Sequence, residues 1–188
     1  MSLLDKVVAA VTPLESDEAR EDARAKAQAL ANTGDWLSLV LSHHVQIESA
    51  FAAVKSAADP ASRVAAQKRL AILLTGHSIA EEVVLYPALA GADEKAHATK
   101  AYTEQSAAKM EMGLLEKLPP MSQEYMDKLE HIRGAVSHHV YEEEGTWFIQ
   151  LKEKVSEADQ EKLSARYQQE FDRYVGADST PTEVRKYA

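Results

Sequence analysis

The sequence predicts an all-α protein built around an antiparallel, up-down-up-down four-helix bundle with extra helices at both ends. Glycine and proline are scarce, at 7 and 6 of 188 residues, whereas Ala, Leu, Glu and Lys are abundant, and these are strong helix formers. Apolar residues recur three or four positions apart over four long stretches, as on one face of an α-helix. The breaks between these stretches are short, and short connections make successive helices antiparallel neighbours.

Turn and capping residues place the elements along the chain. The bundle helices are expected at about 36–57, 61–89, 93–118 and 122–153. The first follows the break "NTGD", the second follows "ADPAS", the third stops at Pro119-Pro120, and Ser122 can cap the fourth.

Three further helices are expected outside the bundle. They cover about 2–11, ending at Thr12-Pro13, about 17–32 after the cap Ser16, and about 157–175 after the cap Ser156. The chain is therefore divided into an N-terminal helical extension at 1–35, the bundle at 36–153, and a C-terminal helix with a polar tail at 154–188.

Composition excludes several classes of function. The formal net charge of −9 repels phosphate backbones, so no nucleic-acid partner is expected. The absence of cysteine excludes disulfides, thiolate metal sites and cysteine catalysis. No run of eighteen apolar residues occurs, and the N-terminal apolar run is too short and too interrupted by charge for a signal peptide. The expectation is a cytoplasmic protein that does not enter a membrane.

Three bundle helices place polar groups on the face that should be buried. The first has His44 within its apolar stripe. The second has His77 and Glu81, and the fourth has His139 and Glu143. Because residues four apart lie one above the other on a helix, each His-x-x-x-Glu pair aims an imidazole and a carboxylate at one point.

A cation is the simplest compensation for these buried groups. Buried carboxylates are costly unless they are paired or bind a cation, and no Lys or Arg lies in the stripes. Imidazole and carboxylate ligands suit iron or manganese, with zinc as an alternative, and this donor set suits two metals about 3.5 Å apart. Taken singly, His44 is an ordinary buried histidine, and each His-x-x-x-Glu pair is an ordinary helix-surface pair; the coincidence of the three favours a metal site.

The remaining polar and aromatic candidates are given structural roles. His43 and His138 lie one residue off the stripes and are expected to contact the ligands from outside or lie on the surface. We expect solvated side chains for Glu82, Glu142 and Glu144, with a ligand role for one of them as the alternative, and no catalytic role for His97 and His131. Phe51, Tyr86 and Trp147 are near the site and suggest an aromatic lining, with plain core positions as the more ordinary interpretation.

Three segments, "HHVQIESAF", "HSIAEEVVLYPAL" and "HHVYEEEGTWF", resemble the hemerythrin-like, or HHE cation-binding, family over about residues 36–152. The resemblance implies a non-haem diiron centre inside the bundle. By matched position it implies that His44, His77 and His139 are iron ligands and that Glu81 and Glu143 bridge the two irons. Manganese or a mixed metal pair remains an alternative.

The third bundle helix departs from the family pattern. Family members usually have a histidine there, whereas this chain has Gln105, which also lies on the inward stripe of the helix. A glutamine can bind iron weakly, hold a water, leave a position open, or hydrogen-bond a ligand. The neighbouring Glu104 is an alternative ligand, and Tyr102 can aim its hydroxyl at a bound oxygen species.

The ligand count suggests a function in handling small oxidants. The resemblance implies three histidines instead of the five usual in oxygen carriers, which favours reaction with dioxygen, peroxide or nitric oxide over oxygen storage. The hypothesis is a bacterial-type diiron protein in the oxidative-stress response, with peroxide- or nitric-oxide-consuming turnover left open. An oxygen, redox or iron sensor without turnover and an iron-handling protein are the alternatives. Both a monomer and a homodimer fit the sequence.

Overall fold

The structure is a computed structural model that describes residues 15–176, and all regular structure in that range is helical. The all-α prediction is therefore confirmed, while the helix expected at 2–11 lies outside the described residues. The elements are α2 (Asp17–Leu30), α3 (Trp36–Ser56), α4 (Pro60–Ala80), η1 (Glu81–Leu85), α5 (Tyr86–Gly91), α6 (Lys95–Leu115), α7 (Gln123–Glu142), η2 (Glu143–Trp147), α8 (Phe148–Lys154) and α9 (Glu157–Val175).

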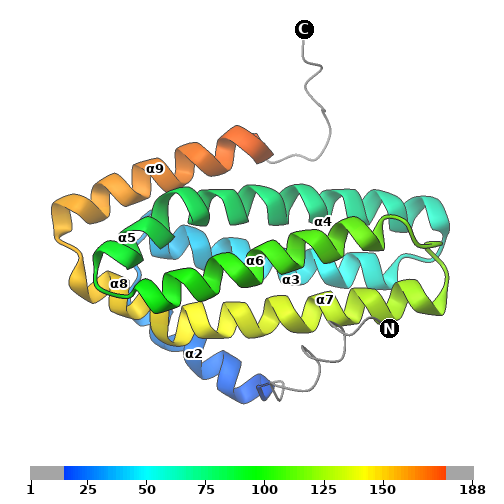
Figure 1. Ribbon diagram of the computed structural model, residues 1–188, viewed down its shortest axis with the longest axis horizontal. Helices are drawn as coiled ribbons and strands as arrows, with labels where there is room; N and C mark the ends of the chain where they lie inside the picture. Colours follow the sequence, from blue (N-terminus) through cyan, green and yellow to red (C-terminus); the bar gives the residue numbers. More distant parts are fainter. Residues whose placement is uncertain (1–14, 177–188) are drawn as a thin grey trace, which may run out of the picture.

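Four long helical segments lie side by side along the molecule (Figure 1). They are α3, the continuous run α4-η1-α5, α6, and the continuous run α7-η2-α8. α3 packs against α4, α6 packs against both α5 and α7, and α3 also contacts α7. The bounds agree with the expected ranges to within about three residues at each end, so the helical periodicity located these elements well.

Side-chain caps explain where the helices begin. The hydroxyls of Ser16, Ser122 and Ser156 each accept a hydrogen bond from a backbone N–H three residues later, as expected. Asp35 caps α3 in the same way, and Asp59 forms a reciprocal capping box with Ser62 at the start of α4. Each cap satisfies an N–H that has no partner inside its own helix, which stabilises the helix by about 1 kcal/mol.

Two single π-helical turns interrupt the long helices, and the sequence period did not predict them. η1 begins at Glu81 and η2 begins at Glu143, so each starts at the glutamate of a His-x-x-x-Glu pair. The backbone N–H of Tyr86 donates to the Glu81 carbonyl, and that of Phe148 donates to the Glu143 carbonyl, both five residues back. A π-turn inserts one extra residue, so the residues beyond it face a different direction.

The hydrophobic core forms two clusters along the bundle. One cluster contains Trp36, Leu89, Phe148 and neighbouring residues, and the other contains Phe51, Leu70, Leu129 and neighbouring residues. On each long segment, the residues of the two clusters are separated in sequence by buried polar side chains. These polar side chains are His43 and His44 on α3, His77 and Glu81 on the second segment, Gln105 on α6, and His139, Glu143 and Glu144 on the fourth. The bundle therefore has a buried polar layer between two apolar clusters.

The two outer helices pack on opposite sides of the bundle (Figure 1). α2 contacts η2, α3, α7 and α8, while α9 contacts α4, α3 and η1. α2 buries only Ala23 and Ala27, so this alanine-rich helix packs lightly on the bundle. α9 buries Tyr167 and Phe171. The division at 1–35, 36–153 and 154–188 stays a prediction, but both outer helices touch the segments that form the polar layer.

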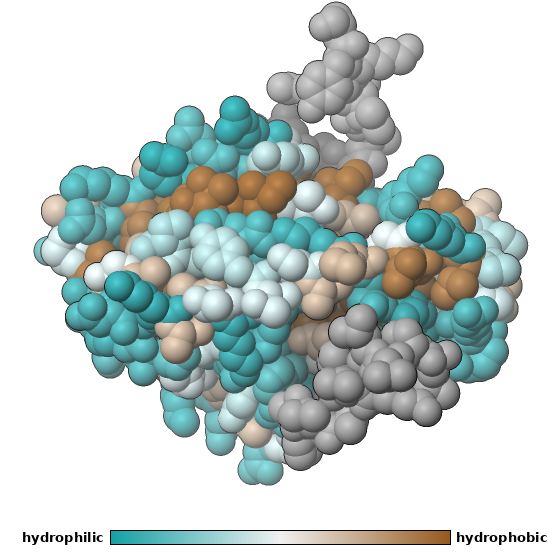
Figure 2. Space-filling view, viewed as in Figure 1, coloured by the Kyte–Doolittle hydropathy of each residue, from teal (hydrophilic) through white to brown (hydrophobic). Residues whose placement is uncertain are grey.

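Most of the surface is polar, with local apolar patches on the face shown in Figure 2. The exposed apolar side chains in the described part include Ile72, Val83, Met110 and Leu114. Each helix within residues 15–176 is too short or too polar to cross a membrane.

The close approach of α9 to α4 depends on Gly76. A Cβ atom at this buried position would overlap the Val175 side chain and lie 3.4 Å from the Cβ of Tyr174. We therefore expect Gly76→Ala to lower the free energy of unfolding by about 1–3 kcal/mol, the usual cost of overpacking. Gly113→Ala is the matched control, because Gly113 is an exposed position on α6 and no atom lies within 4 Å of its added Cβ. Helix propensity should make that variant neutral or more stable by up to about 1 kcal/mol. Urea denaturation of the metal-free proteins measures both, and equal stabilities would contradict this packing.

Candidate metal centre

Four buried residues from three segments meet in the polar layer. His44, His77, Glu81 and Glu143 each offer one ligand-capable atom, and these atoms all lie within 4.8 Å of one another. His139 joins them through Nε2, which lies 3.2 Å from Oε1 of Glu143. The structure thus brings together the five residues that the sequence singled out as metal ligands.

The geometry within this cluster follows from helix spacing. In each His-x-x-x-Glu pair, one turn of helix places the two side chains together: His77 Nε2 lies 3.2 Å from Glu81 Oε2, matching the 3.2 Å of the second pair. His44 faces both carboxylates, with Nε2 at 3.3 Å from Glu143 Oε2 and 3.9 Å from Glu81 Oε1. Each carboxylate therefore directs its two oxygens toward different imidazoles.

Several buried atoms of the cluster have no hydrogen-bond partner among the described residues. They are His44 Nε2, Glu81 Oε1 and Glu143 Oε2, and Gln105 Oε1 on α6 is likewise unpaired. A buried polar atom without a partner typically costs about 1–3 kcal/mol. Each of these four atoms has a free lone pair when it carries no proton, so the set fits a cation.

The charges of the cluster balance through protons in the absence of a cation. Burial and the charge of Glu143 raise the pKa of Glu81 to about 7. Burial would also raise the pKa of Glu143, but the charge and hydrogen bond of His139 hold it well below its usual range. Burial would lower the pKa of His139, but the charge of Glu143 and hydrogen bonds to Glu104 and Glu143 raise it to about 10. Thus His139 is positively charged beside a negatively charged Glu143.

The other two imidazoles differ from each other. Burial would lower the pKa of His44, but the nearby carboxylates of Glu143 and Glu144 raise that pKa well above the usual value. Burial and the charge of His44 lower the pKa of His77 well below the usual value. His77 is therefore neutral and needs no deprotonation before Nε2 can bind a cation.

The outer nitrogen of each imidazole also has a partner. Nδ1 of His44 lies 2.8 Å from Glu144 Oε1, and Nδ1 of His139 lies 2.8 Å from Glu104 Oε2. Nδ1 of His77 lies 3.2 Å from the hydroxyl of Tyr167. When Nδ1–H donates outward, Nε2 keeps a free lone pair that faces the cluster.

The expectation that Glu144 is solvated was wrong. Its residue is only 1% exposed, because α2 covers it and Arg24 donates through Nε to both carboxylate oxygens at 3.1 Å. The same guanidinium holds Glu48 with its two terminal nitrogens. Glu82 and Glu142 are only partly exposed and pair with Lys109 and Lys100.

The three alternatives on α6 take different positions. Gln105 is buried and donates from Nε2 to Glu81 Oε2 at 2.6 Å. Glu104 contacts His139 on its outer side, as described above. Tyr102 is 37% exposed, and its hydroxyl donates to the backbone carbonyl of Glu82 instead of the cluster.

The tyrosine at the centre of the cluster is Tyr86, which the sequence stripes did not single out. Its buried hydroxyl donates to Glu143 Oε1 at 2.8 Å and lies 3.3 Å from Glu81 Oε2 and 3.1 Å from His139 Nε2. Tyr86 lies five residues after Glu81, so only the π-turn brings it to this face. A tyrosine five residues after the glutamate was the available signal, and it depends on an irregularity that the period of 3.6 hides.

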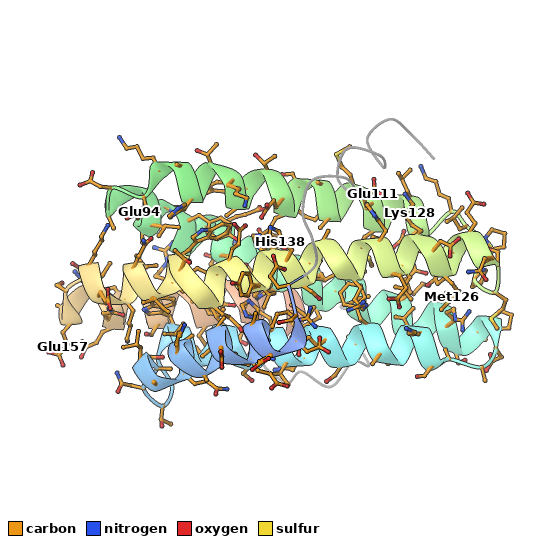
Figure 3. The ribbon with its side chains drawn as sticks, turned by 90° about the horizontal axis from the view of Figure 1, so that it is seen from below. Glu94, Glu111, Met126, Lys128, His138 and Glu157 are labelled. Atoms are coloured by element: carbon orange, nitrogen blue, oxygen red, sulfur yellow. The ribbon has the colours of Figure 1, made fainter. Side chains whose placement is uncertain are left out.

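His43 and His138 lie at the boundary of the cluster. His43 is buried and its Nδ1 lies 2.9 Å from the Tyr167 hydroxyl, and burial lowers its pKa to about 3. His138 lies near the C-terminal end of α7, about midway along the continuous segment α7-η2-α8 (Figure 3), with its two ring nitrogens near Glu15 and Glu142. Glu104, His138 and Glu142 can also be grouped as a metal-capable set, but Lys100 forms ion pairs with both glutamates.

Comparison with known families decides the class of this site. The family profile described as the hemerythrin HHE cation-binding domain matches residues 35–151, which include the whole cluster. The chain belongs to this hemerythrin family. The family establishes a cation-binding helical domain, and the buried His/Glu cluster is where such a cation can be held.

The hemerythrin chain is also similar to part of a larger curated protein. It is 29% identical over 94 residues to a protein named "DNA nickase" from Nostoc sp.. That match covers 50% of this chain and 27% of the relative, so the chain spans about a quarter of the relative's length. No solved structure matches the chain.

Cation binding is expected to release protons. His139, with its pKa of about 10, is protonated at neutral pH and must lose the Nε2 proton before that nitrogen can bind a cation. Rising pH weakens this competition up to the pKa of His139, so affinity should increase steadily from roughly pH 6 to pH 10. Calorimetric titration with Mn²⁺ in two buffers of different ionisation enthalpy measures the number of protons released. Identical binding enthalpies in the two buffers would show that no proton leaves.

Proposed function

We propose that this hemerythrin protein is an up-down-up-down antiparallel four-helix bundle that holds two iron ions and reacts with small oxidants. The proposed ligands are His44, His77, Glu81, His139 and Glu143. The observation that supports this best is the convergence of ligand-capable buried atoms from four of these residues within 4.8 Å of one another, with His44 Nε2, Glu81 Oε1 and Glu143 Oε2 lacking any hydrogen-bond partner. A manganese pair or a mixed pair remains an alternative, because imidazole and carboxylate ligands suit each of these metals.

The orientation of the carboxylates supports a pair of metals. Glu81 turns Oε2 toward His77 and Oε1 toward His44. Glu143 turns Oε1 toward His139 and Oε2 toward His44. A carboxylate that bridges two metals needs its two oxygens directed to different places, and both glutamates have this arrangement.

Side chains around the ligands would orient a small oxidant and supply a proton. Bound iron would supply reversible one-electron oxidation and an open coordination position. Tyr86 holds a proton on its hydroxyl at the centre of the cluster, where it donates to Glu143. Burial and the charges of Glu143 and Glu81 raise the pKa of Tyr86, so this proton is retained until a more basic group takes it. The apolar clusters on either side keep bulk water out.

A surface pocket leads toward the cluster, although the cluster residue in its lining, His44, is itself buried. The pocket has a volume of about 320 Å³, lies between α2, α3 and α7, and includes His44 in its lining. Its lining combines the apolar side chains of Ile47, Phe51, Val136 and Val140 with charged side chains that include Arg24 and Glu48, and its volume admits small molecules such as dioxygen and nitric oxide. A second pocket of about 350 Å³ near Asp35 and Lys152 includes no residue of the cluster.

Other proposals concern partners and location. We propose a cytoplasmic monomer or homodimer whose partners are small diatomic or peroxide ligands. The relative's DNA nickase activity is not transferred to this chain, because the match covers about a quarter of that protein and the net charge of −9 disfavours DNA. A sensor or an iron-handling protein with the same site remains the alternative, and turnover distinguishes these from an oxidoreductase.

Metal content and absorption test the proposed site directly. Protein loaded with iron should contain two irons per chain and show the near-ultraviolet charge-transfer absorption of a bridged ferric pair. His77→Ala should lose both, because it removes one imidazole from the cluster. His131→Ala is the matched control, since this α7 histidine is outside the cluster. Wild-type protein that folds but binds no metal would contradict the proposal.

Reaction with oxidants is tested on the reduced, iron-loaded protein. With excess chemical reductant present, we expect catalytic consumption of peroxide or nitric oxide by wild-type protein and none by His77→Ala. Reversible dioxygen binding without turnover would contradict the reactive assignment and support oxygen storage. Metal binding with neither reaction would favour the sensor or iron-handling alternative.

Tyr86 provides a second test of the reaction. Tyr86→Phe removes only the hydroxyl that donates to Glu143. The variant should still bind metal but consume the oxidant about 10²-fold more slowly or worse, as for loss of a positioned proton donor. Tyr102→Phe is the control, because its hydroxyl donates to a backbone carbonyl away from the cluster. A larger loss in Tyr102→Phe than in Tyr86→Phe would show that the wrong tyrosine was assigned.

A further inference from the structure

The imidazole of His77 is held from outside by a helix that lies beyond the family match. The match ends at residue 151, whereas α9 covers Glu157–Val175. α9 packs on α4, α3 and η1 and turns the fully buried Tyr167 toward the metal cluster. The Tyr167 hydroxyl is 3.2 Å from Nδ1 of His77 and 2.9 Å from Nδ1 of His43.

Stacked rings hold this hydroxyl in place. The His43 ring lies between α9 residues and the bundle, with its centroid 3.7 Å from that of Phe171 and an interplanar angle of 15°. It also stacks on Tyr167 at 5.6 Å and 24°. Gly76 on α4 allows α9 to approach closely, as shown above. The position of the Tyr167 hydroxyl is thus fixed by ring stacking on His43 and by the close approach of α9 to α4.

The hydrogen bonds that link His77, Tyr167 and His43 can run in only one direction when His77 binds a cation. Nε2 of His77 faces the cluster, 3.2 Å from Glu81 Oε2, and must be unprotonated to bind a cation. A neutral imidazole then has its proton on Nδ1, which donates to the Tyr167 oxygen. The one hydroxyl hydrogen of Tyr167 is then donated to Nδ1 of His43.

His77 differs in this respect from the other two imidazoles. His44 and His139 have carboxylates, Glu144 and Glu104, on Nδ1, whereas His77 has only the Tyr167 hydroxyl. Loss of the hydroxyl leaves the Nδ1–H of His77 buried without an acceptor. The proton then favours Nε2, where Glu81 accepts it, and this tautomer cannot bind a cation.

We propose that Tyr167 is a positioning residue for His77 and that α9 is therefore a part of the metal centre. Its hydroxyl fixes the His77 proton on Nδ1 and so leaves Nε2 free to bind the metal. By linkage, a bound metal that requires this tautomer also stabilises the docking of α9. This inference rests on the proposed metal site and assigns to it a residue outside the family domain.

The test compares Tyr167→Phe with Tyr174→Phe in the full-length chain. Both variants lose one hydroxyl from α9, but Tyr174 is 47% exposed and lies outside the hydrogen-bond chain. Metal affinity is measured with Zn²⁺ in competition with a chromophoric chelator. Tyr167→Phe should weaken binding about 10- to 100-fold, as for other residues that hold metal-bound histidines. Tyr174→Phe should bind as tightly as wild type.

Two further measurements separate positioning from simple packing. Histidine ¹⁵N NMR of the Zn²⁺-loaded protein should show a slowly exchanging Nδ1 proton on His77 in wild type and in Tyr174→Phe, and its loss in Tyr167→Phe. Amide exchange of residues 157–175 should slow on Zn²⁺ binding in wild type but not in Tyr167→Phe. Tyr167→Phe keeps the aromatic ring and loses only the hydroxyl, so a change in packing alone would not produce these two differences from wild type.

The outcomes separate this inference from the proposed function. Wild-type affinity in Tyr167→Phe, or an unchanged His77 Nδ1 proton, would overturn the positioning role while the metal site stands. A wild-type protein that binds no Zn²⁺, Mn²⁺ or Fe²⁺ would instead overturn the proposed function, and the role of Tyr167 with it.

Discussion

Two carboxylates buried side by side are the constraint on which the rest of this structure depends. Glu81 and Glu143 are both 0% exposed, and neither has a Lys or Arg partner in the described part of the chain. Water would solvate such charges far better than an apolar core does. Two of the three imidazoles compensate them, because the raised pKa values of His44 and His139 indicate that protons bring the positive charge when no cation does. A cation replaces those protons, so metal binding, protonation and core stability are linked properties of one layer.

The two π-turns change which side chains face the polar layer, and an unbroken α-helix would not do this. Spacing of four residues brings His77 to Glu81 and His139 to Glu143, but it leaves the following residues in register with the apolar stripe. One extra residue at Glu81 turns Tyr86 into the cluster, where its hydroxyl contacts both carboxylates. The extra residue at Glu143 accompanies the burial of the adjacent Glu144 against Arg24 on α2. Both irregular turns lie in the polar layer, which is consistent with the frequent placement of π-bulges at functional sites.

Local sequence patterns predicted those features that depend on one helix at a time. The helix bounds, the serine caps, both His-x-x-x-Glu pairs and the inward position of Gln105 follow from spacing within single elements. The roles of Glu144 and Tyr167 did not follow, because each depends on an outer helix whose docking site is a tertiary property. The alanine-rich face of α2 and the four-residue spacing of Tyr167 and Phe171 on α9 are compatible with packing, but neither specifies which surface of the bundle the helix covers.

Gln105 shows how one substitution can change the balance of such a site. A histidine at this point would add an imidazole to the cluster, whereas the glutamine donates from Nε2 to Glu81 Oε2 at 2.6 Å. An ionised carboxylate has only acceptor oxygens. The N–H of Gln105 therefore favours the charged form of Glu81 and holds one of its oxygens in place. The other oxygen, Oε1, stays unpaired and faces His44. The exchange thus removes a nitrogen donor and strengthens a carboxylate, which increases the oxygen character of the ligand set. Oxygen donors stabilise the more oxidised, harder state of a metal ion. A site altered in this direction is better suited to giving electrons to a small oxidant than to releasing it unchanged, which is why the proposed function is reaction and not storage.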